Sequence, residues 1–188
     1  MEPMTYYGAK ELAASFRTVR SNTLKIANDI PEDKYSFRPA EGTRTVGELL
    51  AHIAFGSKFN EQIQFVEKRS SLDGFDFMTF MGGVMAEGAK PRTKAEIIAL
   101  LTSQGEDFAN KMGALSEDFL AEIVTMPQGM QPPSRSRFDM LTSVKEHEMH
   151  HRGQLMLIER MLGITPHLTA EMQARMAAMQ AQAASAQK

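Results

Sequence analysis

Apolar residues recur at helical spacing in four stretches of the chain, and segments rich in proline and glycine separate these stretches. Apolar positions every three or four residues place one apolar stripe on a helix, which the helix buries against its neighbours. The first stretch ends before Pro31, because the residue preceding a proline is pushed out of the α region. Four such helices around one core predict an all-α chain folded as a four-helix bundle with long connecting loops. The expected helices span about residues 6–28, 45–68, 93–114 and 136–163.

Two of these helices begin with a clear sequence signal. Thr45-Val-Gly-Glu48 and Thr93-Lys-Ala-Glu96 are capping boxes, in which the threonine and the glutamate each bond the backbone N–H of the other. Gly163 suits the position just after the last helix, where a left-handed backbone is common. The starts of two helices and the end of the last one are therefore predicted closely.

The chain is expected to form one domain over residues 1–165, followed by a tail over residues 166–188. Residues 70–92 combine turn signals with large apolar side chains, so they either pack over a bundle end and line a pocket or contain a short helix. The proline-rich link at 123–135 is expected to run extended. The tail is rich in Ala, Gln and Met, which fits a frayed end or a short helix docked on the bundle or on a second subunit.

Three histidines fall within five residues of the last expected helix. His147 and His151 lie one turn apart, so their Cβ atoms are about 5–6 Å apart on one helix face. His150 lies off that face and is expected to pack between helices or to meet solvent. A polar ring in a core position needs a partner, and two at this spacing favour a shared metal ion. The stripe with His147 and His151 is otherwise apolar and contains Met140, Val144, Leu155, Ile158 and Leu162.

A further histidine, His52, lies on the second expected helix, one turn after Glu48. Taken alone, a hydrogen-bonded core histidine is the simpler interpretation of His52. Together with the pair on the last helix, it becomes the candidate for a third ligand, in a metal site formed by His52, His147 and His151. Its stripe also contains Phe55, Gly56, Phe59, Ile63 and Val66.

Three imidazole ligands leave part of the coordination sphere of a divalent metal open to water or to a substrate atom, which distinguishes a reactive site from a closed structural one. Zinc, nickel and ferrous iron all accept nitrogen ligands, so ligand type does not select the metal. A metal in such a site lowers the pKa of a bound water to about 7, or holds and activates a thiolate.

Other polar residues near the histidine pair have less defined roles. Glu148 lies about 60° off the stripe and is expected to be solvated, with roles as hydrogen-bond partner of a ligand, general base or fourth ligand as the alternatives. Gln154 is comparable on the other side, and His167 is expected at the surface or at a subunit contact. The string His147-Glu-Met-His-His151 also matches the HExxH motif of zinc proteases. That interpretation is disfavoured, because so short a motif often arises by chance and His52 offers a better third ligand.

Composition excludes several classes of protein. The chain has no cysteine, which removes disulfides, thiolate ligands and a cysteine nucleophile, and suits a reducing cytoplasm. Its formal charge of −2 gives no general attraction to nucleic acid. No apolar run reaches the length that spans a bilayer, and no secretory signal is recognisable. We therefore expect neither a nucleic acid nor a membrane as a partner.

Two motifs carry a resemblance to a known family. Val46-Gly-Glu-Leu-Leu-Ala-His52 and His147-x-x-His-His-Arg-Gly-Gln-Leu155 together resemble the DinB-like (DinB/YfiT) superfamily of bacterial four-helix-bundle metalloproteins. The loop with Ile30-Pro-Glu-Asp-Lys-Tyr35 is also similar, and the resemblance covers roughly residues 5–163. It implies a metal triad of His52, His147 and His151, with His150 not a ligand, and it implies a frequent dimer.

The resemblance also implies a class of activity. Relatives include metal-dependent transferases that activate low-molecular-weight thiols, such as bacillithiol or mycothiol, and proteins described only as metal-dependent hydrolases. We therefore expect a cytoplasmic, homodimeric metal-dependent enzyme, a thiol-dependent S-transferase or a hydrolase, acting on a small electrophile. The alternative is a non-catalytic metal-binding module of a stress response, and a bundle with a histidine cluster but no metal is the third hypothesis.

Overall fold

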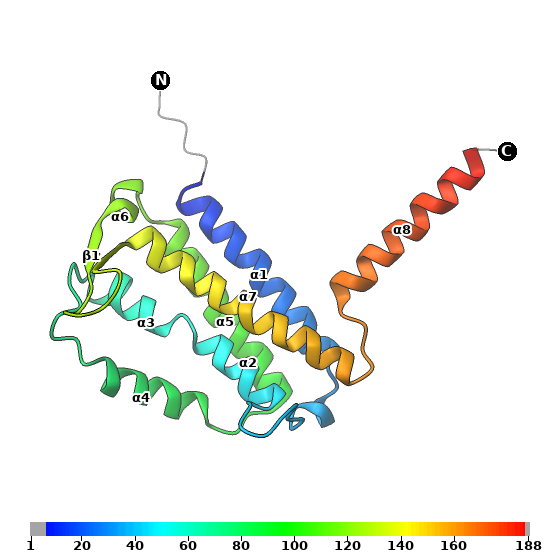
Figure 1. The fold of residues 1–188 in the computed structure, drawn as a ribbon, viewed down its shortest axis with the longest axis horizontal. Coiled ribbons are helices and arrows are strands. Elements are labelled where there is room, and N and C mark those ends of the chain that lie inside the picture. Colours follow the sequence, from blue (N-terminus) through cyan, green and yellow to red (C-terminus); the bar gives the residue numbers. More distant parts are fainter. Residues whose placement is uncertain (1–6, 187–188) are drawn as a thin grey trace.

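The four long helices expected from the sequence form a bundle in the computed structural model, which describes residues 7–186 (Figure 1). They are α1 (Ala9–Asp29), α2 (Val46–Phe55), α5 (Lys94–Gly113) and α7 (Arg137–Met161). α1 packs along α5 and α7, and α2 packs against the same two helices, which confirms the predicted four-helix bundle. The predicted helix start at Tyr6 and the outer ends of the predicted domain and tail, residues 1–6 and 187–188, lie outside the described residues.

Both predicted capping boxes are present. The backbone N–H of Thr45 donates to Glu48 Oε2 at 2.7 Å, and that of Thr93 donates to Glu96 Oε2 at 2.7 Å. Each threonine hydroxyl in turn accepts from the backbone N–H of its glutamate. Gly163 follows α7 with a φ of +77°, a left-handed conformation that glycine adopts without strain.

The second expected helix is not continuous, which corrects the prediction of one helix over 45–68. α2 ends at Phe55, a short α3 (Lys58–Asn60) follows, and the chain continues as a π-helix, η2 (Glu61–Val66). In a π-helix each N–H bonds five residues back rather than four, so later side chains rotate off the stripe. Val66, expected on the apolar stripe, is consequently 69 % exposed.

The segment 70–92 contains a helix, which was one of the two structures expected for it. α4 (Phe77–Gly88) begins after Asp76, whose Oδ1 accepts from the backbone N–H of Thr79 at 3.0 Å. α4 lies beside α2 on the outside of the bundle (Figure 1). It contains no fully buried residue, so it covers α2 without becoming part of the core.

The connection between α5 and α7 contains the only β-structure in the described part of the chain, apart from an isolated bridge between Ser71 and Thr125. A short α6 (Glu117–Ala121) leads into β1 (Ile123–Thr125), which pairs antiparallel with β2 (Ser134–Ser136). The link expected to run extended thus pairs with itself, while the backbone groups of Thr125 bond to Ser70 and Leu72. A short 3-10 helix, η1 (Glu32–Lys34), lies in the loop before α2.

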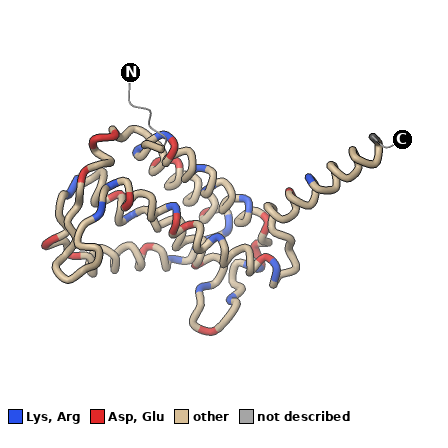
Figure 2. Tube along the Cα trace, turned by 45° about the horizontal axis from the view of Figure 1, so that its top comes forward, with Lys and Arg blue, Asp and Glu red and all other residues tan. Residues whose placement is uncertain are grey.

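The tail forms a helix, α8 (His167–Ala186), that projects away from the bundle (Figure 1). Within residues 7–186, polar contacts attach the first turns of α8 to the rest of the chain: Glu171 pairs with Lys25 at 2.9 Å, and the Thr169 hydroxyl accepts from Arg160 at 3.1 Å. Figure 2 shows basic and acidic residues interspersed over the bundle, whereas α8 carries few charges. Its methionines 172, 176 and 179 are exposed, and the expected homodimer stays a prediction. No helix within residues 7–186 is long and apolar enough to cross a membrane.

Candidate metal centre

Three histidines from two helices meet between α2 and α7. His52 lies on α2, and His147 and His151 lie one turn apart on α7. The two helices contact one another, and an apolar cluster that includes Ile53 and Leu155 holds them together beside the histidines. The bundle therefore brings together the three residues that the sequence singled out, and their ligand atoms all lie within 4.8 Å of one another.

The three rings approach one another through their Nε2 atoms. His52 Nε2 lies 3.0 Å from His147 Nε2, and His151 Nε2 lies 3.2 Å from that atom. The ring of His52 is steeply inclined to those of His147 and His151, with interplanar angles of 65° and 83°. Three lone-pair-bearing edges thus point toward one small volume instead of stacking.

The donor set fits one divalent metal ion. In a tetrahedral site with metal–nitrogen bonds of about 2.0–2.1 Å, neighbouring ligand nitrogens lie about 3.3 Å apart. The two observed separations, 3.0 and 3.2 Å, are close to that value. Hydrogen bonds alone satisfy three such nitrogens poorly. Each neutral Nε2 either donates or accepts, so among three of them at least two have the same role and cannot bond to each other. A divalent cation held by His52, His147 and His151 would satisfy all three lone pairs and would have room for a further ligand.

Gln154 fixes the tautomer of one ligand. Its Oε1 lies 2.8 Å from His151 Nδ1, one turn along the exposed side of α7. Because an amide oxygen only accepts, Nδ1 carries the proton and the lone pair of His151 lies on Nε2, facing the other histidines. The side chain that the sequence left without a defined role therefore orients a candidate ligand.

The histidines are held in their uncharged form. Burial lowers the pKa of His52 and of His147 from 6.5 to about 4. Burial is also the main reason why the pKa of His151 is lowered, and the positive charge of Arg44 acts in the same direction on all three. An uncharged imidazole has a free lone pair at neutral pH, so a metal ion does not have to displace protons there.

Gly56 makes room for His147. A Cβ atom on Gly56 would lie 2.9 Å from His147 Nδ1 and 3.0 Å from its Cε1, closer than such atoms approach. The imidazole of His147 is therefore packed directly against the backbone where α2 ends. Any side chain at position 56 pushes this ring away from the other two.

Glu148 is not solvated, which corrects the expectation from its angle on the helix. It is 2 % exposed, its carboxylate accepts two hydrogen bonds from Arg20 at 2.9 Å, and Oε1 also accepts from the Thr23 hydroxyl at 2.7 Å. Glu148 does point away from the histidine stripe of α7, but a neighbouring helix, α1, covers that side of α7. A carboxylate held by a guanidinium and a hydroxyl is unsuited to act as a base, so the zinc-protease interpretation loses its glutamate.

The two remaining histidines lie outside the triad. His150 is exposed, and its Nε2 lies 3.3 Å from Gln154 Nε2. His167, at the start of α8, is half-buried with its Nε2 3.2 Å from Asn22 Oδ1 on α1. His167 therefore ties α8 to the bundle.

Two cavities flank the triad. One of about 300 Å³ is lined by His52, by Phe55 and by the α4 residues Met81, Val84 and Met85. The other, of about 680 Å³, is lined by His151 and Gln154 and by the loop before α2. Arg44 and Glu48 line both cavities, and each cavity is lined by one histidine of the triad.

Two residues of this site, Gly56 and Arg44, were not predicted from the sequence to have a role in it. Gly56 lies on the stripe of His52, one turn further along, and a glycine at that place is a usable signal of close approach. Arg44 offers no such signal, because an arginine before a helix cap is ordinary. Only the folded chain shows that it lines both cavities.

Comparison with known proteins gives the family. The model of the DinB superfamily matches residues 15–155, a range that contains all three histidines and most of the bundle. The chain belongs to the DinB superfamily. Among its relatives is the uncharacterized protein YjoA of Bacillus subtilis (strain 168), which is 23 % identical over 157 residues, 84 % of this chain and 92 % of YjoA.

Solved structures with the same fold are known. The crystal structure of the DinB-like YjoA from Bacillus subtilis has a TM-score of 0.59 at 22 % identity and covers 82 % of this chain and 93 % of its own. YfiT from Bacillus subtilis, described as a probable metal-dependent hydrolase with an unusual four-helix bundle topology, has a TM-score of 0.65 at 13 % identity. That match covers 88 % of this chain and 93 % of YfiT. At these identities the likeness concerns the fold alone.

Proposed function

We propose that this protein is a metal-dependent enzyme that binds one divalent ion through His52, His147 and His151 and acts on a small electrophile. The observation that carries the proposal is the convergence of the three Nε2 atoms, with separations of 3.0 and 3.2 Å from His147. The description of YfiT as a probable metal-dependent hydrolase supports it. Zinc, nickel and ferrous iron all suit three imidazoles, and the donor set does not choose between them.

The protein residues bind and orient the reacting groups in this proposal. The three imidazoles, uncharged at neutral pH, hold the ion, and Gln154 fixes the orientation of the His151 ring. When bound, the ion lowers the pKa of a water or a thiol that it holds and so supplies a nucleophile at neutral pH. The cavities beside His52 and His151 admit the electrophile and shield it partly from solvent.

A low-molecular-weight thiol is the co-substrate that we propose. The resemblance to thiol-dependent transferases of the superfamily supports this choice, with hydrolysis by water as the alternative reaction. The chain has no cysteine, so the thiol has to come from outside the protein. Both cavities, of about 300 and about 680 Å³, fall near or within the size range of small-molecule sites.

Metal analysis and activity assays of matched variants test the proposal. Protein purified without a histidine tag is analysed for bound metal and then assayed with panels of thiols, electrophiles and esters. We expect His147→Ala and His151→Ala to lose both metal and turnover, whereas His150→Ala, which alters an exposed histidine outside the triad, keeps both. Bound metal without turnover on any panel would favour the non-catalytic binding module. Unchanged metal content in the two triad variants would refute the proposal.

A further inference from the structure

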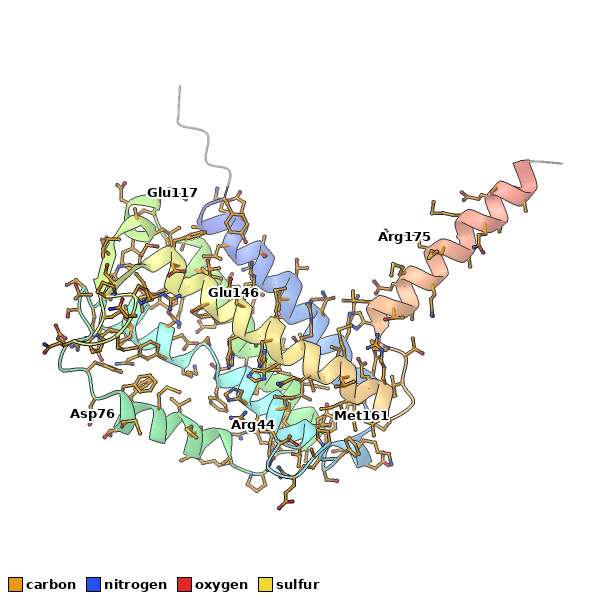
Figure 3. All side chains as sticks on the ribbon, viewed as in Figure 1. Arg44, Asp76, Glu117, Glu146, Met161 and Arg175 are labelled. Carbon is orange, nitrogen blue, oxygen red and sulfur yellow. The ribbon has the colours of Figure 1, made fainter. Side chains whose placement is uncertain are left out.

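Arg44 is a positive charge at the entrance to the histidine site. It directly precedes Thr45, the N-cap of α2, and Figure 3 labels it at that end of the helix. Its side chain lines the cavity beside His52 and also the cavity beside His151. Arg44 is an exposed residue, so its guanidinium is accessible to a molecule bound in either cavity.

The charge of Arg44 has no partner among residues 7–186, where no hydrogen bond or ion pair involves its side chain. Glu48 is the acidic residue that lines both cavities, and its carboxylate already has other partners. Its Oε2 accepts from the Thr45 backbone N–H at 2.7 Å, and Arg38 pairs with it at 3.1 Å. Arg38 and Glu48 neutralise each other, so the entrance retains one net positive charge.

The surroundings of Arg44 set the rest of the ligand's chemistry. The cavity beside His52 is also lined by apolar side chains from α2 and α4, namely Phe55, Met81, Val84 and Met85. Methionine side chains adapt their shape to different apolar groups. The cavity thus combines a single unpaired cation, an apolar wall and one imidazole of the triad, that of His52.

We propose that Arg44 binds the carboxylate of a small monoanionic substrate whose apolar body lies against α4 in the cavity beside His52. A guanidinium forms two parallel hydrogen bonds with a carboxylate, and one net positive charge matches one negative charge better than the two of a phosphate monoester. That the other, reactive end of the substrate points toward the histidines rests on the proposed function. That Arg44 binds the carboxylate of the substrate is independent of the proposed function.

A matched pair of ligands isolates the charge. The zinc-loaded protein is titrated with 3-phenylpropionate and with its neutral amide, 3-phenylpropionamide, and binding is followed by NMR. We expect the acid to bind about tenfold more tightly than the amide, and Arg44→Gln to abolish that ratio. Arg175→Gln removes one charge from α8, away from the cavities, and is expected to keep the ratio. Equal ratios in the wild type and in Arg44→Gln would overturn the proposal, because the carboxylate would then bind elsewhere, for example on the zinc ion.

A second pair of variants locates the site. Met85 lines the cavity beside His52 and is 64 % exposed, and Leu157 lines the other cavity and is 60 % exposed. A new carboxylate repels the ligand's own, so we expect Met85→Glu to weaken binding of the acid while Leu157→Glu leaves it unchanged. The reverse result would place the ligand in the cavity beside His151 and overturn the proposal. Tighter binding of phenyl phosphate than of 3-phenylpropionate would overturn the carboxylate assignment.

A thiol pair separates this inference from the proposed function. The cobalt-loaded protein is titrated with 3-mercaptopropionate and 3-mercaptopropionamide, and thiolate ligation is followed by the absorption of the cobalt ion. If neither thiol changes the spectrum while the phenylpropionate ratio holds, thiol activation at the metal fails and the carboxylate site stands. If both thiols ligate equally in wild type and Arg44→Gln and the phenylpropionate ratio is absent, the carboxylate site fails and thiol activation stands.

Discussion

His147 Nδ1 lies 2.9 Å from the point where a Cβ atom on Gly56 would stand, so the end of α2 and a candidate metal ligand on α7 are packed as closely as the backbone permits. Gly56 has a φ of −61°, which any residue adopts, so its absence of a side chain matters for close contacts, of which those to His147 are the shortest and one to the Ile53 carbonyl oxygen, at 3.2 Å, is the next. The glycine is thus needed for the site and not for the backbone conformation.

Replacing Gly56 is expected to damage the metal site selectively. Gly56→Ala pushes the His147 ring away from the other two, and we expect metal affinity to fall by about tenfold or more. Competition with a chromophoric chelator measures the affinity. Gly153→Ala is the matched control on α7, because a Cβ there meets nothing within 4 Å. Equal affinities for the two variants would contradict the role given to Gly56.

Gln154 is expected to support metal binding through its acceptor oxygen. Gln154→Ala leaves His151 Nδ1 without its partner at 2.8 Å, which frees the ring to change tautomer and orientation. Outer hydrogen bonds of this kind typically change metal affinity by about 10–100-fold. Gln154→Glu keeps an acceptor oxygen and is expected to retain most of the affinity. Alanine and glutamate variants that bind metal equally well would show that the bond has no such role.

Glu148 is expected to stabilise the fold by neutralising Arg20. The two side chains are 2 % and 6 % exposed, so Glu148→Ala leaves a buried guanidinium without its counter-ion. We expect a loss of about 3–5 kcal/mol in the free energy of unfolding, measured with urea. The exposed pair Arg17–Glu106 is the control, and Glu106→Ala is expected to cost under about 1 kcal/mol. Similar losses for the two variants would contradict the importance of burial.

The histidine site is expected to make the metal-free protein acid-sensitive. The pKa of His52 and of His147 is about 4 in the folded chain, below the ordinary 6.5, so the unfolded chain binds more protons between these values. Stability is therefore fully present above about pH 6.5 and is lost as the pH falls toward about 4. Urea unfolding across this range measures it, and His52→Gln should flatten the profile. If the dependence of stability on pH were identical in His52→Gln and in the wild type, His52 would not be a source of the acid sensitivity.

Glu159 is expected to act on stability with the opposite sign. It is fully buried on α7, and neither carboxylate oxygen has a hydrogen-bond partner among the described residues. Burial, with a contribution from Asp29, raises its pKa from 4.5 to about 7. The folded chain therefore binds its proton more tightly, and stability falls as the pH rises from 4.5 through about 7.

A neutral substitute tests this expectation. Glu159→Gln should be more stable than wild type at pH 8 by on the order of 2 kcal/mol and equal to it near pH 4. Glu146→Gln, an exposed position on the same helix, should leave the profile unchanged. A Glu159→Gln variant with no gain at pH 8 would show that the carboxyl finds a partner.

The sequence by itself determined three of the four long helices, two helix caps and the identity of the candidate ligands. Apolar periodicity depends on local geometry, so α1, α5 and α7 were predicted nearly to their ends. The i, i+4 spacing of His147 and His151 fixes their distance on any helix. The apolar periodicity did not predict the break of the second helix into α2, α3 and a π-helix, since a π-helix depends on the side chains that pack around it.

Only the tertiary structure decided which charged residues belong to the site. A helical angle gives the direction of a side chain but not what lies in that direction, so Glu148 was expected in solvent, whereas α1 meets it there with Arg20. Arg44 is far from His151 in the chain and reaches the same cavity because the loop before α2 folds over α7. Contacts between distant segments follow from packing of the whole chain, which no local pattern encodes.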